Sequence, residues 1–230
     1  MRGAATLFAG LFALALLAFW PSYLSRLRAG ATGYVHVHAV AMTLWFALLI
    51  AQALLIRAGR RALHRKLGAA SYGLAPVVVV AGVLLAHAAL VRDAAGDPDG
   101  AGTTAYLPLT MIAWFTACYA LAIAYRKVPA LHARFMIGTS LAAVDPIASR
   151  VAAFYFPPLE DASRYPLVSW GVIAAILVVF MAAERGQRRG RTVFPALLAA
   201  STVVFALWFV LAPSAAWLAF ARWFRDLPIT

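Results

Sequence analysis

The sequence predicts an all-α, polytopic membrane protein, and three observations lead to this fold class. Of the 230 residues, 64% are hydrophobic and 12% are charged, which is more apolar surface than a soluble domain of this length can bury. The apolar residues form continuous runs, whereas strands of a membrane barrel alternate apolar and polar residues. Several runs reach the roughly 20 residues that a helix needs to cross a hydrocarbon core. We therefore expect one membrane domain, residues 1–230.

Seven runs qualify as transmembrane helices. They cover residues 4–22, 35–56, 67–91, 105–125, 133–156, 167–183 and 193–213. Phe19-Trp20-Pro21 stands where a signal peptide would need small residues for cleavage, so we expect the first helix to be retained. Residues 215–225 are too short to cross and carry Trp and Arg, which predicts an interfacial amphipathic segment. The glycine-rich stretch 96–102 is expected to be an outer turn.

The distribution of charge predicts the topology. Thirteen of the twenty basic residues fall on one side of the predicted spans, namely Arg2, Arg57, Arg60, Arg61, Arg65, Lys66, Arg126, Lys127, Arg134, Arg185, Arg188, Arg189 and Arg191. Six of the eight acidic residues fall on the other side, namely Asp93, Asp97, Asp99, Glu160, Asp161 and Asp226. The positive-inside rule then places the N-terminus in the cytoplasm and the C-terminus outside. The net charge of +12 thus reflects topology, and we expect the lipid bilayer, not nucleic acid, as the partner.

Two predicted hairpins resemble each other in sequence. The pattern M-x-x-W-F at residues 42–46 recurs at 111–115, and A-L-H at 62–64 recurs at 130–132. Both hairpins would enter the membrane from outside and turn at a basic cytoplasmic loop. We therefore expect a pseudo-two-fold core of hairpins 35–91 and 105–156, with its axis along the membrane normal. The helices at 4–22, 167–183 and 193–213 would be peripheral.

The outer histidines are candidate ligands. A helix turns about 100° per residue, so His36 and His38 point about 200° apart. His38 shares a face with Met42, Trp45 and Gln52, and such a polar stripe should face the bundle interior, which leaves His36 at the interface. His87 is expected at the depth of His38, about 6 Å below the outer boundary. Two imidazoles at one depth are suited to a b-type haem iron, or to copper or zinc. Separate hydrogen bonding of each ring is the alternative.

The inner histidines, His64 and His132, occupy equivalent places in the repeat, among basic residues. A positive potential disfavours protonation, and neutral imidazoles suit metal or haem ligation, here as a second haem or a quinone-level site. For the outer haem, Arg150 is available as the cation for the propionates. Helix capping, interfacial anchoring or binding of lipid headgroups would explain the same residues.

Asp145 and Arg150 lie inside the fifth predicted span, where charges are costly unless paired or hydrated. Pro146 removes one backbone hydrogen bond there, and Ser149 lies one turn beyond Asp145 on the same face. Tyr72, in the third span, is a possible cross-helix partner. This cluster predicts proton handling or substrate binding, or else a polar contact between helices.

The chain carries R-x-x-R-R-x-L-H-R-x-L-G at 57–68, L-H-x-R-F-M-I at 131–137 and the intramembrane Arg150. On these residues, the stretch 35–155 resembles a family of bacterial multi-pass membrane proteins classed as a domain of unknown function. Many members have a basic and an aromatic residue after M-I, whereas this chain has Gly138-Thr139-Ser140. The resemblance implies a bundle of two repeated hairpins in a bacterial inner membrane, and it implies no reaction.

Three functions fit these residues. The first is a redox protein that holds one or two b-type haems and exchanges electrons with quinone or a redox partner. The second is a proton-coupled small-molecule transporter that uses Asp145 and Arg150. The third is an accessory or assembly subunit without chemistry. The single cysteine, Cys118, excludes a disulfide framework and is expected to pack in the core.

Overall fold

The chain folds into helices throughout the part that the structure, a computed structural model, describes: residues 3–27, 32–156, 165–184, 186 and 189–230. Five charged residues used in the topology prediction lie outside this part, namely Arg2, Glu160, Asp161, Arg185 and Arg188. The chain divides into two compact units, Met1–Gly82 and Val83–Thr230. Each unit is described in turn.

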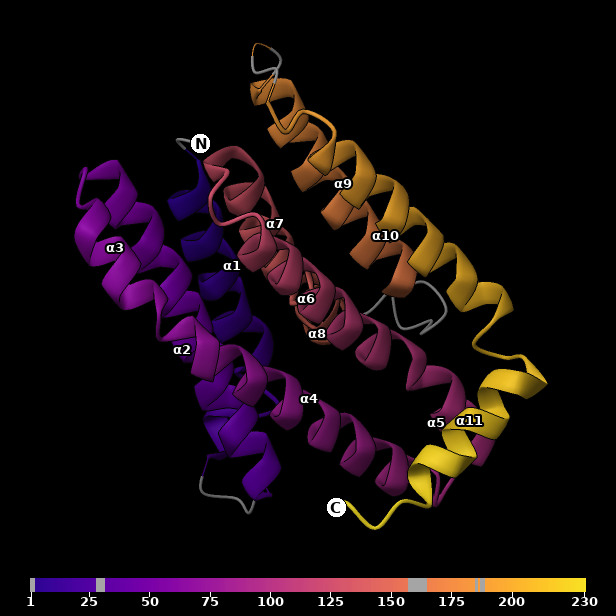
Figure 1. Ribbon diagram of the computed structural model, residues 1–230. Helices are drawn as coiled ribbons and strands as arrows, with labels where there is room; N and C mark the ends of the chain where they lie inside the picture. Colours follow the sequence, from indigo (N-terminus) through magenta and orange to yellow (C-terminus); the bar gives the residue numbers. More distant parts are fainter. Residues whose placement is uncertain (1–2, 28–31, 157–164, 185, 187–188) are drawn as a thin grey trace. The chain divides into compact units, whose positions relative to one another are not determined.

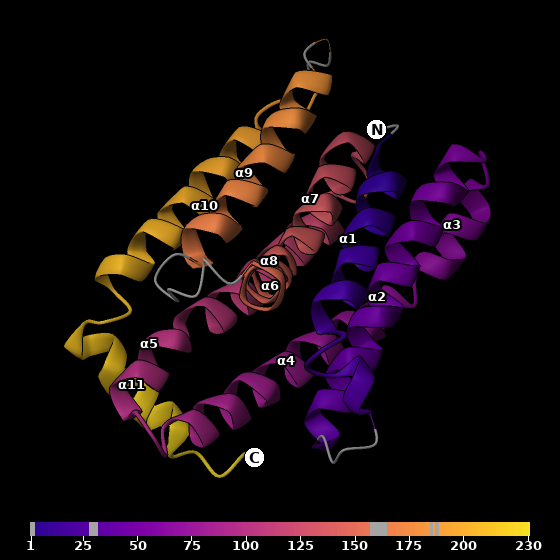
Figure 2. The ribbon, with the colours of Figure 1, turned by 180° about the vertical axis from the view of Figure 1, so that it is seen from behind.

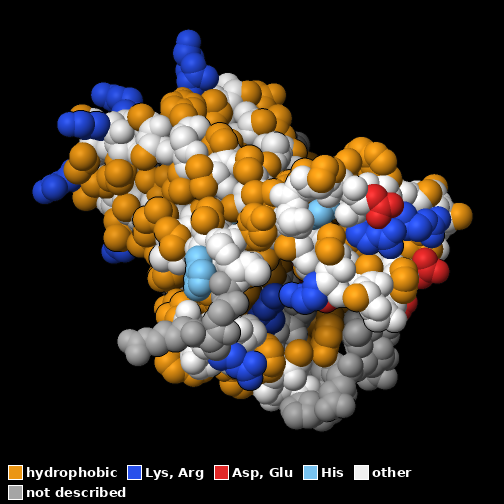
Figure 3. Space-filling view, turned by 90° about the horizontal axis from the view of Figure 1, so that it is seen from below, with side chains coloured by type: hydrophobic (Ala, Val, Ile, Leu, Met, Phe, Trp, Pro, Cys, Tyr) orange, Lys and Arg blue, Asp and Glu red, His pale blue; other side chains and the backbone are white. Residues whose placement is uncertain are grey.

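Five helical segments of the described chain are long and apolar enough to cross a membrane. They are α2 (Gly33–Arg57), α4 (Ser71–Asp93), α5 with α6 (Pro98–Ala124), α9 (Tyr165–Ala183) and α10 (Val193–Val210). Their large apolar side chains are often exposed, with Val179 at 65% and Val210 at 72%, and Figure 3 shows hydrophobic side chains over much of the face in view. This pattern is compatible with an integral membrane protein, because exposed apolar side chains are favourable in contact with lipid and unfavourable in contact with water.

The first unit contains α1 (Ala4–Phe19), a short 3₁₀ helix (Leu24–Arg26), α2, α3 (Arg61–Gly68) and the first half of α4. Helices α1 and α2 lie side by side, and the rings of Phe12 and Phe46 stack at a centroid distance of 5.9 Å (Figure 1). The predicted run 4–22 is helical only to Phe19. Pro21 explains this end, because a proline disfavours helical backbone at the residue before it.

The predicted single helix 67–91 is wrong at its start. A separate short helix, α3, precedes a turn at residues 69–70, and α4 begins at Ser71. Gly68 ends α3 against α2, since a Cβ there would lie 3.3 Å from Nε2 of Gln52. The Ser71 hydroxyl donates to the Gly68 carbonyl at 2.7 Å, which satisfies a carbonyl at the end of α3. The close approach of Gly68 to α2 and the cap by Ser71 therefore mark the boundary between α3 and α4.

The second unit begins with the C-terminal half of α4, followed by α5 (Pro98–Thr104) and α6 (Tyr106–Ala124). The turn predicted at residues 96–102 is instead largely helical. Asp97 is the N-cap of α5, with its Oδ1 accepting from the Gly100 amide at 3.0 Å, and Pro98 is the first helical residue. Asp followed by Pro is a favourable helix start, which outweighs the two glycines that follow.

The predicted span 133–156 is divided into two helices, α7 (Pro129–Leu141) and α8 (Val144–Tyr155). Pro146 has no amide hydrogen to donate to the Ala142 carbonyl, and its ring crowds that carbonyl, which accounts for the break. The Ala143 amide closes the turn on the Ser140 carbonyl at 3.2 Å, and the Ile147 amide donates to the Ala143 carbonyl at 3.2 Å.

Helices α9 and α10 lie side by side in both ribbon views, and α11 (Ala215–Arg225) lies beside α5 (Figures 1 and 2). The segment at 215–225 forms the helix α11. The Ser214 hydroxyl caps it by accepting from the Trp217 amide at 3.3 Å, and Trp217 Nε1 donates to the Gly102 carbonyl at 2.9 Å. These contacts fasten α11 to α5. The place of α11 at the membrane interface stays a prediction.

The residues of the sequence repeat match in burial at one of the three M-x-x-W-F positions. Phe46 and Phe115 are both buried, whereas Trp45 is buried and Trp114 is partly buried, and Met111 is buried and Met42 is partly buried. The seven-span count and the two-fold repeat stay predictions. Cys118 is buried, as expected for a core residue, and packs against Gly138 of α7.

Replacement of Gly138 by alanine should destabilise the packing of α6 on α7. A Cβ at residue 138 would lie 2.9 Å from Cys118 Sγ and 3.3 Å from a methyl carbon of Leu197. We expect Gly138→Ala to lose about 1–2 kcal/mol of stability through overpacking, measured as thermal unfolding in detergent. Gly171→Ala is the matched control, because a Cβ there meets nothing within 4 Å. Adding Cys118→Ala to Gly138→Ala should restore stability, because it removes the sulfur atom that the new methyl group would meet. An unchanged loss of stability in the double variant would contradict overpacking as the cause.

Candidate functional site

His36 and His38 both lie in the first turns of α2, so the predicted angular separation applies to a regular helix. The His36 ring forms a hydrogen bond through Nδ1 with the Tyr23 hydroxyl at 2.8 Å. His38 is partly buried, and its Nδ1 is shielded from solvent. On the same side as His38, the Trp45 side chain is fully buried, as expected for an inward stripe.

His36 also lines a shallow apolar groove of about 310 Å³ between α2 and the start of α4. The groove residues are His36, Val37, Val40, Ala41, Leu44, Leu74 and Val77. His36 is the polar side chain among them. His36 and His38 thus lie in different surroundings. In a regular helix, positions 36 and 38 do not share one site.

The remaining candidate residues of the first unit are Gln52 on α2, His64 on α3 and Tyr72 at the start of α4. The Gln52 amide is shielded from solvent, has no hydrogen-bond partner within the described residues, and packs on Gly68. His64 lies in the first turn of α3, where its amide donates to the Arg60 carbonyl at 3.0 Å. Tyr72 is 54% exposed in its unit, which is more open than expected for an intramembrane partner.

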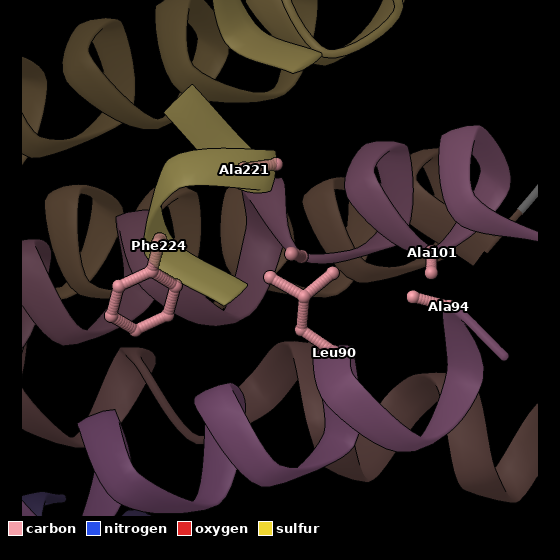
Figure 4. Packing of buried hydrophobic residues seen from close by; sticks show 6 residues of the cluster. Leu90, Ala94, Ala101, Ala221 and Phe224 are labelled. Atoms are coloured by element: carbon pink, nitrogen blue, oxygen red, sulfur yellow. The ribbon is translucent and has the colours of Figure 1, made fainter. Parts of the chain in front are cut away.

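His87, in the C-terminal half of α4, is almost completely buried, with 1% of its surface exposed. Its Nδ1 forms a hydrogen bond with the Thr230 hydroxyl, and the Phe224 ring meets it edge-on at a centroid distance of 5.0 Å. Its Nε2 is buried and has no hydrogen-bond partner within the described part of the chain. Figure 4 shows Phe224 of α11 beside Leu90 of α4 in the apolar cluster next to this ring. A buried ring nitrogen without a partner is uncommon and needs a physical explanation.

His132 lies in the first turns of α7 and is held by α6. Its Nδ1 is 2.9 Å from the Ala122 carbonyl oxygen. A carbonyl only accepts, so Nδ1 carries the proton, and in the neutral ring Nε2 carries the lone pair. Histidines that bind metals commonly donate their other ring nitrogen to a carbonyl in this way. The bond therefore fixes the tautomer that ligation by Nε2 requires.

Asp145, Ser149 and Arg150 lie together on α8, just after the break. Asp145 is buried in the first turn of the helix, and the Ser149 hydroxyl donates to the Asp145 backbone carbonyl at 2.8 Å. Arg150 Nη1 donates to the Pro146 carbonyl at 3.1 Å, and its charge acts on the Asp145 carboxylate. Ser169 of α9 lies next to the same carboxylate. Sequence reasoning missed Ser169, because nothing in an apolar helix marks which serine will meet an acid.

A buried ion pair between Arg134 of α7 and Glu184 was also missed. Arg134 Nε and Nη2 both reach Glu184 Oε2, at 2.9 and 2.7 Å, and Nη1 donates to the Ala130 carbonyl at 2.7 Å. The guanidinium lies over the Phe194 ring at 5.7 Å. Gly190 has a φ of +76° and allows the α9–α10 connection to pass the guanidinium, where a Cβ would lie 2.5 Å from Nη1. Arg134, counted above as a topology charge, is thus neutralised inside the protein.

The described residues contain no group of three or more His, Cys, Asp or Glu side chains that would enclose a metal ion. A zinc site of the usual three or four protein ligands is therefore not formed by them, whereas a haem iron needs only one or two imidazoles. His38 and His64 belong to the first unit, His87 and His132 to the second, and their pairing stays a prediction. No protein-family model, curated protein or solved structure matches this chain significantly.

Replacing one partner of the Arg134–Glu184 pair should reduce stability more than replacing both partners with apolar residues. Arg134→Ala leaves a buried carboxylate without its partner, which costs about 3–5 kcal/mol, and Glu184→Ala should cost a similar amount. The double replacement Arg134→Met with Glu184→Leu should recover most of the lost stability, measured by thermal unfolding in detergent. Arg126→Ala is the control, since this arginine is exposed. Equal losses at positions 126 and 134 would contradict a buried pair.

Proposed function

We propose that this chain is an integral membrane protein that binds b-type haem through histidine Nε2 atoms. The observation that carries the proposal is the anchoring of Nδ1: the Ala122 carbonyl holds His132, and the Thr230 hydroxyl holds His87. Because both rings are anchored through Nδ1, ligation of iron falls to Nε2. The buried and unpartnered Nε2 of His87 supports the same role among the described residues.

The residues of the chain would hold the group and set its surroundings. His87 is proposed as a ligand on the outer side, and His132 as a ligand on the cytoplasmic side. The sequence predicts His38 as the second outer ligand and His64 as the second cytoplasmic ligand. Arg150 is proposed as the cation for the propionates. Bound haem supplies one-electron transfer, with quinone or a redox protein as the proposed partner.

The proposed topology has seven crossings of a bacterial inner membrane, with the N-terminus in the cytoplasm. Besides the five long helical segments, it requires α1 and the broken pair α7–α8 to cross. Helix α1 has 16 residues and is about 24 Å long, which a locally thinned bilayer accommodates. A broken helix is tolerated at membrane depth where protein covers it, and Asp145 and Ser169 are both buried at this break.

The absorption spectrum of the purified full chain, after incubation with haem, tests this proposal. We expect a Soret band and sharp α-bands on reduction, with roughly a tenfold or greater loss of haem affinity in His132→Ala or His87→Ala. His36→Ala is the matched control, because its Nδ1 is bonded to Tyr23 at the edge of an apolar groove. A protein that stays colourless, or spectra unchanged in both variants, would refute haem binding and favour an accessory subunit.

The break between α7 and α8 favours a second candidate, a proton-coupled carrier. Carriers commonly place coupling ions at discontinuous helices, and here a buried carboxylate stands at the start of a half-helix. Asp145→Asn should reduce proton flux into vesicles containing the protein by roughly tenfold or more, read with an enclosed pH-sensitive dye. Thr116→Ala is the control and should leave the flux unchanged, because its hydroxyl bonds the Ile112 carbonyl on an exposed part of α6. Flux that persists in Asp145→Asn would rule out this role for the carboxylate.

A further inference from the structure

The end of α2 and helix α3 carry a dense cluster of positive charge. Residues 57–66 include five basic side chains, all of them exposed, namely Arg57, Arg60, Arg61, Arg65 and Lys66. The unit that contains them, Met1–Gly82, has no Asp or Glu in its sequence. Arg134 of the other hairpin, which follows His132 by two residues as Lys66 follows His64, is instead neutralised by Glu184. The cluster at residues 57–66 thus has no acid in its own unit to neutralise it.

The described acidic side chains of the second unit are already engaged within that unit. Two of them are Asp97, which caps α5, and Asp145, on which the charge of Arg150 acts. The other four form ion pairs with arginines at 2.7–3.6 Å, namely Asp93 with Arg92, Asp99 with Arg222, Glu184 with Arg134 and Asp226 with Arg225. We therefore expect the anions that neutralise residues 57–66 to come from outside the chain.

Helix α3 is attached to α2 by one narrow face. His64 and Gly68, four positions apart, are its partly buried residues, and the other side chains of Arg61–Gly68 are exposed. Gly68 lies against α2, since a Cβ there would be 3.3 Å from Nε2 of Gln52. Most of the surface of α3 is thus open to a partner from outside the unit.

The exposed surface of α3 separates apolar from basic side chains. Leu63 and Leu67 are four positions apart and share a face, on which they are 44% and 36% exposed. Arg61 and Arg65 share another face. Because each arginine precedes a leucine by two positions, the two faces point about 200° apart. A helix with exposed leucines on one side and cations on the other is typical of a helix that lies on a lipid surface.

We infer that α3 and the turn before it bind the phosphate headgroups of anionic phospholipids. The guanidinium groups of Arg61 and Arg65 suit phosphate oxygens, to which arginine donates in pairs. Leu63 and Leu67 would contact the adjoining acyl chains, whereas a free phosphate ion would leave both leucines in water. Clusters of four to eight basic residues next to a membrane helix commonly bind anionic lipids. The inference goes beyond haem binding and does not depend on it.

Native mass spectrometry of the purified full chain in a neutral detergent measures this binding. We expect phosphatidylglycerol to bind roughly tenfold or more tightly than phosphatidylcholine. Arg61→Gln with Arg65→Gln should lower the affinity for phosphatidylglycerol by roughly tenfold or more, since each basic residue near a lipid surface contributes about fivefold. Arg61→Lys with Arg65→Lys should retain most of the affinity, because both charges remain.

Arg126→Gln with Lys127→Gln is the matched control. It removes the same charge from two exposed residues at the turn between α6 and α7, and it should change the affinity less than about twofold. Equal binding of the two lipids, or equal losses in the two Gln double variants, would overturn the site. Equal losses would show that net charge alone, and not α3, selects the lipid.

The leucines distinguish a lipid from a free phosphate ester. Leu63→Ser with Leu67→Ser should lower the affinity for phosphatidylglycerol several-fold at unchanged charge. Glycerol phosphate, which has no acyl chains, should displace the lipid only at roughly a hundredfold higher concentration. Displacement at equal concentration, or an unchanged affinity in the serine double variant, would overturn lipid binding in favour of a soluble phosphate ester.

Discussion

A polar group that is buried away from water must find a partner inside the protein, and this constraint accounts for much of the arrangement of the polar side chains. Arg134 gives its donors to Glu184 and to the Ala130 carbonyl. His132 donates to the Ala122 carbonyl, and Trp114 Nε1 donates to the Gly138 carbonyl at 2.9 Å. Most of these bonds join one helix to another, so polar contacts fasten the helices that apolar packing alone would hold loosely.

Several buried polar atoms of the described residues are exceptions to this internal matching. The side-chain amide of Gln52, Oε1 of Glu184 and Nε2 of His87 are buried without hydrogen-bond partners of standard geometry. His87 differs from the other two, because it is an imidazole whose other ring nitrogen is already anchored to Thr230. A nitrogen donor of this kind suits haem iron better than a hard cation.

Much of the helical architecture follows from the sequence, because length and continuity of apolar runs dictate helices in lipid. The mixture of aromatic and basic residues at 215–225 indicates an interfacial segment, and the structure adds that this segment is a helix capped by Ser214. Pro146 is expected to remove one hydrogen bond from a continuous span, whereas in the structure it divides the span at residues 142–143. Helix α5 was not predicted, because its two glycines favour a turn although Asp97-Pro98 is a favourable helix start. The ion pair was missed because Arg134 and Glu184 are 50 residues apart and no local pattern joins them.

The histidine tautomer is the most direct measure of the central claim that the protein orients imidazoles for ligation by Nε2. Nitrogen-15 NMR of histidine-labelled protein, assigned by comparison with His132→Ala, reports which ring nitrogen carries the proton. For the neutral imidazole of His132 in the haem-free protein, we predict a protonated Nδ1 and an unprotonated Nε2. A His132 ring protonated at Nε2 and not at Nδ1 would contradict the bond to Ala122, and with it the orientation on which haem binding depends.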